Sequence, residues 1–289
     1  MSDNSFGNTE TKNQIVSDAL KFTNSHYENF PVASLLLPKG IRNHVAIVYR
    51  FARQADDIAD EGNIPNEQRI RFLDNYRLQL SDSLNGKYAD KFWEALHCTI
   101  KSFNLTHKYF FDLLSAFEQD ITKHRYNLFE DVLDYCKRSA NPVGRIILEF
   151  FNIHDQKAIE YSDAICTALQ LTNFYQDFFV DWQKGRIYIP VSEVEKFGVD
   201  EKIFSEPKIN ANFRELLRLQ VDRTYNIFKK GKLLLPILPK RLRFQIRLTI
   251  LGGEEILKKI EKNNFNVLNY RPKLSKIDYV KLVLKAAIS

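Results

Sequence analysis

Two pairs of aspartates, each with a four-residue spacing, constrain the fold more than any other feature of this chain. The first pair is Asp56 and Asp60, and the second is Asp177 and Asp181. Because an α-helix has 3.6 residues per turn, residues i and i+4 share a face, so each pair points two carboxylates the same way. Two such helices that face one another would form an acidic-walled cavity. Carboxylates held so close together need cations, and Mg²⁺ prefers carboxylate oxygens combined with the phosphates of a ligand.

Further polar side chains continue each pair along its helix. The first stripe is Tyr49, Arg53, Asp56 and Asp60, and the second is Gln170, Asn173, Asp177 and Asp181. The residues around both stripes are mostly aliphatic and aromatic. A solvated helix face, which is the alternative interpretation, would carry Lys and Glu at these positions, whereas tyrosine, arginine and amide groups bind directional partners. We therefore interpret the stripes as binding faces.

The composition favours an all-α chain. Its 289 residues are 44% hydrophobic, and it holds only 10 Gly and 9 Pro. Long helical periodicities dominate, which predicts a single all-α domain over residues 13–289 after a polar, disordered tail over residues 1–12. The cysteines, Cys98, Cys136 and Cys166, lack metal-binding spacing and are typical of a reduced, cytoplasmic protein. The histidines likewise show no zinc-ligand pattern.

Helical periodicity and its breaks predict the positions of the helices. The expected ranges are 13–27, 41–61, 66–84, 88–103, 107–124, 128–138, 142–153, 157–183, 191–196, 210–231, 237–251, 252–263 and 275–287. Gly62 and Pro65 stop the first aspartate helix. After the second, Arg186 and Tyr188 lie in an extended segment just beyond the aspartate stripe, where a metal-bound anion could sit. No stretch approaches the roughly 18 apolar residues of a transmembrane helix.

Positive charge is concentrated near the C-terminus. Residues 208–289 hold 19 Lys+Arg against 6 Asp+Glu, a net +13, and residues 1–207 hold 23 against 30, a net −7. A solvated helical face, an anionic membrane surface and a nucleic acid would each explain the basic segment, in that order of preference. No nucleic-acid motif accompanies it, so we expect no nucleic-acid partner. The expected location is the cytoplasm, with peripheral contact to the inner face of the membrane as an open alternative.

The chemistry of these residues suits a diphosphate joined to a hydrocarbon. Carboxylates would hold Mg²⁺, Arg53 and Arg186 would lie near the anion, and the 13% aromatic content would provide apolar walls. The reaction implied is ionisation: cations stabilise the departing diphosphate, and aromatic faces tolerate a carbocation.

Two motifs carry a resemblance to a known family. The segment Tyr49–Glu61, YRFARQADDIADE, resembles the first aspartate-rich motif of squalene and phytoene synthases. The segment Ala168–Asp181, followed by GRIYIP at 185–190, resembles the second. The resemblance extends from about Asn29 to the C-terminus and implies an all-α trans-isoprenyl diphosphate synthase fold with a central cavity. The chain departs from the commoner phytoene-synthase form at two places. Phe174, Tyr175 and Gln176 replace a segment that often carries an Arg before the aspartate, and Trp182 stands where acidic or small residues are common.

Three segments are most similar to bacterial hydroxysqualene synthases of hopanoid biosynthesis: Phe30–Ser34, Asp56–Gly62 and Tyr135–Arg145. That resemblance implies that presqualene diphosphate and water give hydroxysqualene and diphosphate without a reductant. An enzyme that condenses two prenyl diphosphates into presqualene diphosphate or phytoene is an alternative. A non-catalytic assembly factor or lipid-binding relative is another. Partner synthases of the same pathway would supply the substrate.

The resemblance also implies roles for individual residues. The Mg²⁺ ligands would be Asp56, Asp60, Asp177 and Asp181. The diphosphate and the mouth of the cavity would be contacted by Arg53, Gln170, Asn173, Arg186 and Tyr188. The cavity itself would be faced by Ser34, Tyr49 and Tyr135, where a tyrosine orients water or steers the cation. For Tyr135 the alternative is a core tyrosine with a bonded hydroxyl.

Overall fold

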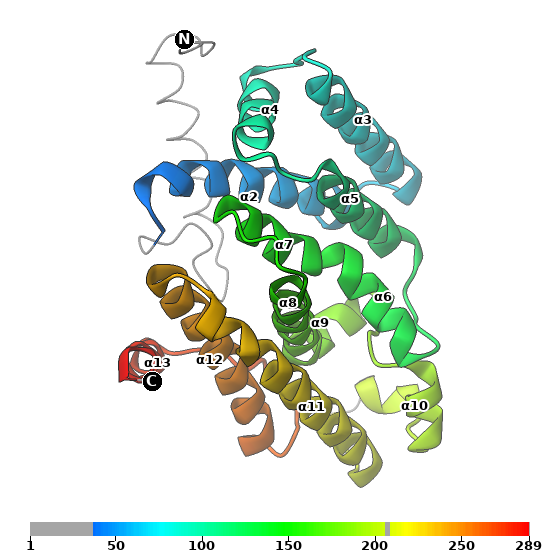
Figure 1. Ribbon diagram of the computed structural model, residues 1–289. Helices are drawn as coiled ribbons and strands as arrows, with labels where there is room; N and C mark the ends of the chain where they lie inside the picture. Colours follow the sequence, from blue (N-terminus) through cyan, green and yellow to red (C-terminus); the bar gives the residue numbers. More distant parts are fainter. Residues whose placement is uncertain (1–36, 206–208, 289) are drawn as a thin grey trace. The chain divides into compact units, whose positions relative to one another are not determined.

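A computed structural model describes residues 37–205 and 209–288. Ser34 and the sequence ranges 1–12 and 13–27 lie outside the described residues. All the regular elements of the described part are helices (Figure 1). They fall into two compact units, and each unit is described by itself. The prediction of a single domain stays a prediction.

Among the described residues, unit 1 comprises 37–121 together with Glu149–Asn152. Its helices are α2 (Lys39–Asp60), α3 (Asn66–Leu84), α4 (Lys91–Phe103) and α5 (His107–Thr122). The core is built on Phe51, whose ring centroid lies 5.4 Å from that of Tyr76, 6.2 Å from Trp93 and 5.4 Å from Phe110. Burying each such side chain contributes roughly 1.5–3 kcal/mol. The aspartate-bearing helix α2 is therefore held on a rigid aromatic base.

Unit 2 comprises Thr122–Leu148 and the residues from Ile153 onward. Its elements are α6 (Phe129–Ser139), α7 (Asn141–Phe150), α8 (Gln156–Gln176), α9 (Phe178–Gln183), α10 (Val191–Lys196), η1 (Glu201–Ser205), α11 (Ala211–Gly231), η2 (Lys232–Ile237), α12 (Lys240–Lys262) and α13 (Lys276–Ile288). Helix α8 lies at the centre, in contact with α6, α11, α12 and η2. Because α8 carries apolar residues around most of its circumference, neighbours on several sides bury it.

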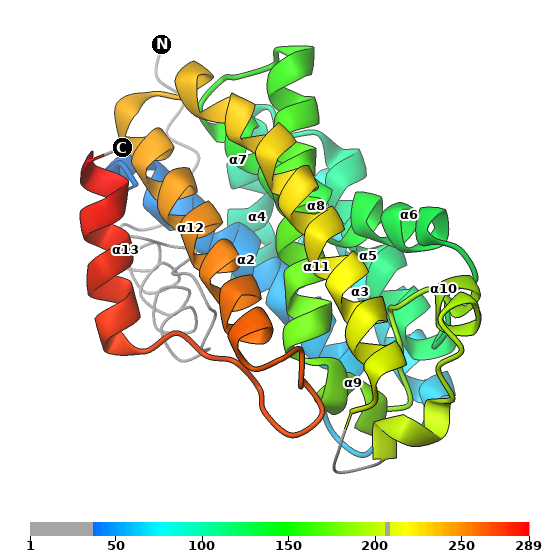
Figure 2. The ribbon, with the colours of Figure 1, turned by 90° about the horizontal axis from the view of Figure 1, so that it is seen from below.

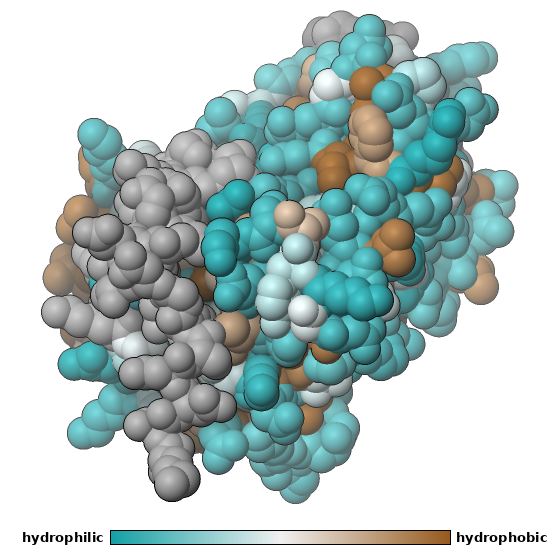
Figure 3. Space-filling view, turned by 90° about the horizontal axis from the view of Figure 1, so that it is seen from above, coloured by the Kyte–Doolittle hydropathy of each residue, from teal (hydrophilic) through white to brown (hydrophobic). Residues whose placement is uncertain are grey.

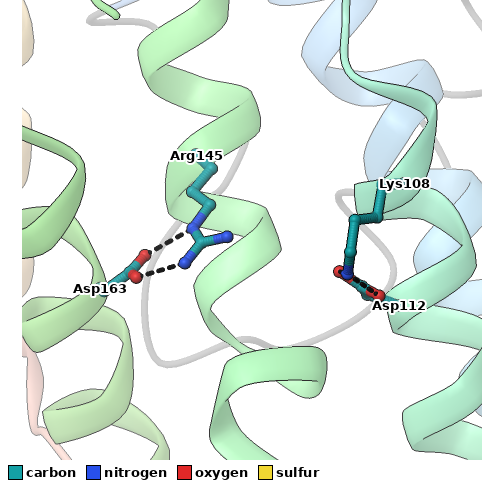
Figure 4. A network of polar contacts seen from close by, with 4 residues as sticks. All are labelled: Lys108, Asp112, Arg145 and Asp163. Atoms are coloured by element: carbon teal, nitrogen blue, oxygen red, sulfur yellow. Dashed lines mark hydrogen bonds and ion pairs between the residues drawn. The ribbon is translucent and has the colours of Figure 1, made fainter. Parts of the chain in front are cut away.

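Helix α7 is fixed closely against α8. A Cβ on Gly144 would lie 2.4 Å from Ser162 Oγ and 2.5 Å from Cys166 Sγ, so a larger residue would force these side chains or the helices to shift. Arg145, the next residue, forms a two-pronged ion pair across the same contact, with Nε and Nη2 at 2.9 and 2.6 Å from the carboxylate oxygens of Asp163 (Figure 4). The similarity noted for Tyr135–Arg145 thus includes residues that determine helix packing.

The predicted boundary between helices 237–251 and 252–263 is wrong, because α12 runs without interruption from Lys240 to Lys262. Gly253, inside this helix, lies at a close packing contact. A Cβ on Gly253 would lie 2.8 Å from the Phe228 ring and 3.0 Å from Leu169 Cδ2. Glycine is needed there for close approach of α12 to its neighbours, and not to end a helix. The other predicted helices of the described part are present, apart from the interruption of 157–183 described below.

No helix among the described residues combines the length and the hydropathy needed to cross a membrane. Figure 3 shows one face of the molecule, on which hydrophilic residues dominate and hydrophobic residues occur in small groups.

Candidate functional site

The first acidic cluster occupies the C-terminal turns of α2 and contains its own cation. Arg53 lies 3.1 Å from Asp56 (Nη1–Oδ2), 2.7 Å from Asp57 (Nε–Oδ1) and 3.0 Å from Glu61 (Nη2–Oε1). The Asp56 side chain remains 36% exposed. The Arg53 guanidinium therefore contacts three carboxylates on one face of α2. Tyr49, one helical turn earlier, is part-exposed. Contact of Arg53 with a diphosphate stays a prediction.

Crowding at the first cluster favours a bound cation. Burial raises the pKa of Asp56 to about 7; Arg53 lowers this pKa, whereas Asp60, Asp120 and Asp57 raise it further. At neutral pH this carboxyl thus sits near its proton-binding equilibrium, because burial disfavours its charged form and the negative charge of the neighbouring aspartates adds to that effect. A divalent cation with a preference for oxygen ligands would relieve that charge.

A buried arginine holds the turn that carries Asp60. Arg69 of α3 donates Nη1 to the carbonyls of Ile58 (2.9 Å) and Glu61 (2.8 Å), and Nη2 to that of Gly62 (2.5 Å). These carbonyls belong to the open C-terminal end of α2, which needs donors and favours positive charge. The sequence interpretation missed Arg69. The available signal was an arginine in the apolar stripe that includes Leu73, Tyr76 and Leu80.

The second acidic cluster lies at a junction between helices, so the predicted continuous helix 157–183 is wrong. Helix α8 ends at Gln176, Asp177 caps it, and α9 begins at Phe178. Backbone bonds nevertheless span the junction, from Asp177 N to Asn173 O (2.8 Å) and from Asp181 N to Asp177 O (2.9 Å). Aspartate is a poor residue inside a helix because its side chain competes for backbone groups. The chain bends at Asp177 while the two aspartates keep their one-turn separation.

A distant loop holds this junction. Arg271, between α12 and α13, donates Nε and Nη2 to the two carboxylate oxygens of Asp177, with the Nη2 bond at 3.0 Å. The adjacent Pro272 carbonyl accepts from Nε2 of the buried Gln176 at 2.6 Å. Both contacts act at the point where α8 gives way to α9, which explains the bend. The sequence interpretation missed Arg271 because 94 positions separate it from Asp177 and no motif contains it.

The other polar residues predicted for the second site lie around it. Asn173 is exposed and Gln170 part-exposed, on the face of α8 that leads to Asp177. Arg186 N donates to the Asp181 carbonyl at 2.8 Å, so Arg186 directly follows the aspartate turn as predicted. Burial lowers the pKa of His124, and Arg186 and Arg125 lower it further. His124 is thus a neighbour of Arg186 that the sequence interpretation did not identify.

An aromatic cluster adjoins the second acidic cluster within unit 2. Phe174, next to Asn173 on α8, stacks on Tyr188 with ring centroids 3.7 Å apart. The Tyr135 ring lies 5.7 Å from Tyr188, 6.0 Å from Phe174 and 5.9 Å from Tyr126. Tyr135 and Tyr188 are 4% and 7% exposed. Burial of Tyr135 agrees with its core alternative, and the four rings pack on one another.

Trp182 has a structural role. Its ring centroid lies 5.4 Å from that of Phe204, and the Arg125 guanidinium lies 5.8 Å from the same indole. This departure from the family pattern therefore anchors α9 to η1.

The residues fit Mg²⁺ only if a ligand completes its coordination. Among the described side chains, no group of three or more His, Cys, Asp or Glu residues is placed to hold a metal. Mg²⁺ commonly binds through one or two carboxylates, with water and substrate phosphates at the remaining positions. Each aspartate pair supplies suitable oxygens. The first pair belongs to unit 1 and the second to unit 2, so their shared cavity stays a prediction.

Comparison with known proteins identifies a family. The family model for squalene/phytoene synthases matches residues 23–278. The hydroxysqualene synthase of Zymomonas mobilis is 33% identical over 227 residues, which cover 77% of this chain and 75% of the relative. That of Sinorhizobium fredii is 31% identical and covers 80% and 78%. The phytoene synthase of Arthrospira platensis is 26% identical and covers 87% and 85%.

Solved structures share the fold. The squalene synthase HpnC from Alicyclobacillus acidocaldarius superposes with a TM-score of 0.83 at 37% identity, covering 90% of this chain and 97% of that one. A dehydrosqualene synthase in complex with a ligand gives a TM-score of 0.88 at 23% identity, covering 96% and 97%, which shows the fold alone. The predicted all-α isoprenoid synthase fold is confirmed.

Proposed function

Because the chain belongs to the squalene/phytoene synthase family, and is therefore an enzyme of that family, we propose that it converts presqualene diphosphate and water into hydroxysqualene and diphosphate. The observation that carries the proposal is the presence of both aspartate motifs in a chain 31–33% identical to proteins named hydroxysqualene synthase. The phytoene synthase described above shares 26%. Condensation of two prenyl diphosphates is the alternative activity.

The proposed reaction is an ionisation followed by capture of water. The bond between carbon and the diphosphate oxygen breaks, and diphosphate leaves with the electron pair. The cyclopropylcarbinyl cation rearranges, water adds through oxygen, and one proton is lost. No electrons are gained or lost overall, so no nicotinamide cofactor is required.

The two acidic clusters would share the diphosphate. We propose that Asp56 and Asp60 from one unit and Asp177 and Asp181 from the other hold Mg²⁺. When bound, Mg²⁺ neutralises the diphosphate and makes it a better leaving group. The oxygen-only donors and the raised pKa of Asp56 support this assignment.

Cationic and amide side chains would orient the leaving group. Arg53, already placed among carboxylates, would keep the first cluster ordered and contact the diphosphate; Arg186 would do so from the end of α9. Gln170 and Asn173 would donate amide hydrogens at the mouth of the cavity. Each of these donors acts on charge that grows during ionisation, where a fixed dipole or cation lowers the barrier most.

The aromatic cluster would receive the hydrocarbon. Tyr126, Tyr135, Phe174 and Tyr188 would line the hydrocarbon site, where aromatic rings attract a carbocation and exclude bulk water. Tyr135 or Tyr49 would orient the captured water, and Ser34 would line the same cavity. Burial of the rings supports this role, because early access of water would quench the cation before rearrangement.

We propose a cytoplasmic enzyme with peripheral contact to the inner face of the membrane, supplied by a partner synthase. The basic segment 208–289 supports this placement. Both substrate and product carry long hydrocarbon chains that partition poorly into water.

Product analysis with two substrates tests the proposed function. Purified protein with Mg²⁺ and no NADPH is given presqualene diphosphate in one reaction and farnesyl diphosphate in another, and products are identified by mass spectrometry. We expect hydroxysqualene from the first reaction only. Presqualene diphosphate or phytoene-type products from the second would assign the condensing alternative, and inactivity of folded protein in both would assign the non-catalytic one.

A further inference from the structure

The C-terminal helix α13 has two apolar faces, of which one is buried. Leu282 and Ala286 are buried, 6% and 1% exposed, on the side that packs against α12. Figure 2 shows the two helices side by side. The opposite side carries large apolar residues that are exposed to solvent: Ile277 at 66%, Val280 at 60%, Leu284 at 58% and Ile288 at 87% exposure. Their spacing of three, four and four residues makes one continuous stripe along the helix.

Lysines flank this apolar stripe. At 100° per residue, Lys276 lies on one side of the stripe and Lys281 on the other, and both are exposed. Lys273, just before the helix, is also exposed. The acidic residue of α13, Asp278, points away from the stripe to Lys259 of α12, at 2.9 Å. The field along the exposed face is therefore positive.

A second exposed apolar element attaches to the same part of α12. Arg247 Nη1 donates to the Ala286 carbonyl of α13 at 3.1 Å. One helical turn earlier, Arg243 Nη2 donates to the Pro236 carbonyl of η2 at 3.1 Å. On η2, Leu233 and Ile237 are 53% and 43% exposed. The end of α13 and the apolar turn η2 thus both belong to the region around the first turns of α12, within the segment of net charge +13.

We propose that the exposed face of α13 docks on an anionic lipid surface, with the helix lying in the plane of the interface. This inference rests on the peripheral membrane contact proposed above and names the surface that makes it. Ile277, Val280 and Leu284 would enter the boundary between headgroups and acyl chains, and the flanking lysines would contact anionic headgroups. A stripe of apolar residues between lysines on a short helix is the pattern that interfacial binding requires. A second copy of the chain would bring like charges together, and a nucleic acid would leave the apolar stripe without a partner.

Vesicle co-sedimentation tests the proposal with the full chain. The probes are vesicles of phosphatidylglycerol mixed with phosphatidylcholine, and vesicles of phosphatidylcholine alone, at low and high salt. We expect binding to the anionic vesicles that weakens with salt, and little binding to the neutral ones. Binding without turnover is measured, so the result is independent of the proposed reaction.

Two variants separate the apolar and the basic contributions. Val280→Gln with Leu284→Gln should weaken binding at least about tenfold, because both side chains lose their apolar partner. Lys276→Gln with Lys281→Gln should weaken it roughly 30-fold at low salt, from about fivefold per lysine. The matched control is Leu78→Gln on α3, where Leu78 is exposed by 58%, the same fraction as Leu284. Circular dichroism verifies that each variant is folded.

Three outcomes would overturn the proposal. The first is wild-type protein that does not bind anionic vesicles. The second is a folded α13 variant that binds as tightly as the Leu78→Gln control. The third is self-association that the Val280→Gln and Leu284→Gln changes abolish, with no lipid binding, which would assign the face to a second copy of the chain.

Discussion

The two acidic clusters pair their carboxylates with arginines of different origin. In unit 1, Arg53 comes from the same helix, three and four residues before the aspartates that it contacts. In unit 2, Arg271 comes from a loop 94 positions away. The first arrangement depends on one helix, whereas the second depends on how a whole subdomain packs. The second cluster should therefore be the more sensitive to changes far from the aspartates.

The largest effect is expected from the aspartates themselves. Asp56→Ala and Asp177→Ala should each lower kcat at least about 100- to 1000-fold, because charge on the leaving group loses its stabilising partner. Steady-state kinetics measure the loss, and circular dichroism confirms the fold. Asp74→Ala and Asp222→Ala, at exposed positions of α3 and α11, are the matched controls. Turnover like that of wild type in either Asp56→Ala or Asp177→Ala would refute the proposed metal role.

The remote arginine gives the sharper test of the comparison. Arg271→Met and Arg271→Lys should each lower kcat/KM about tenfold, because only arginine can donate hydrogen bonds to both carboxylate oxygens of Asp177 in this geometry. Arg218→Met, which removes an exposed pair with Glu215, provides a control with similar charge change. Kinetics together with the melting temperature distinguish a local loss from unfolding. If Arg271→Met behaves like Arg218→Met, the loop does not position the second cluster.

Removal of Arg69 tests how the first cluster is supported. Arg69→Met leaves three carbonyls of the α2 terminus without their donors and should lower the free energy of unfolding by about 2–4 kcal/mol. Urea unfolding followed by circular dichroism measures it. Arg71→Met, two positions along on the exposed side of α3, should change stability by less than about 0.5 kcal/mol. Equal stability of the two variants would show that Arg69 does not support the C-terminal end of α2.

The difference between the clusters also marks the limit of prediction from sequence. Helix positions and the aspartate stripe of α2 follow from local periodicity, so most helices were predicted to within a few residues. The bend at Asp177 depends on contacts from Arg271 and Pro272 that no local pattern encodes. The sequence also predicted two helices, 237–251 and 252–263, where α12 is continuous, and the role of Gly253 depends on the Phe228 ring that packs on it.

The smallest effect concerns the far anchor of the loop that carries Arg271. Asp278 accepts from Ser275 N (2.7 Å) and pairs with Lys259; these contacts lower the pKa of Asp278 to about 2, from an ordinary value of 3.8. A carboxylate whose pKa is lowered in the folded state stabilises the folded protein above pH 3.8, and this contribution disappears as the pH falls toward 2. Asp278→Asn should lower stability by about 0.5–1 kcal/mol at pH 6.

Thermal unfolding of wild type and Asp278→Asn between pH 6 and pH 2.5 measures this contribution. The two melting temperatures should converge as the pH falls below 3.8. A difference that stays constant over this range would show that the charge of Asp278 does not anchor the loop.

The most direct test of water capture by this enzyme is the source of oxygen in its product. The reaction with presqualene diphosphate and Mg²⁺, without NADPH, is run in water enriched in ¹⁸O, and the product is analysed by mass spectrometry. We predict hydroxysqualene whose hydroxyl carries the heavy isotope, as expected when solvent captures a carbocation. Hydroxysqualene without the label, or a hydrocarbon with no oxygen, would contradict capture of water in this site.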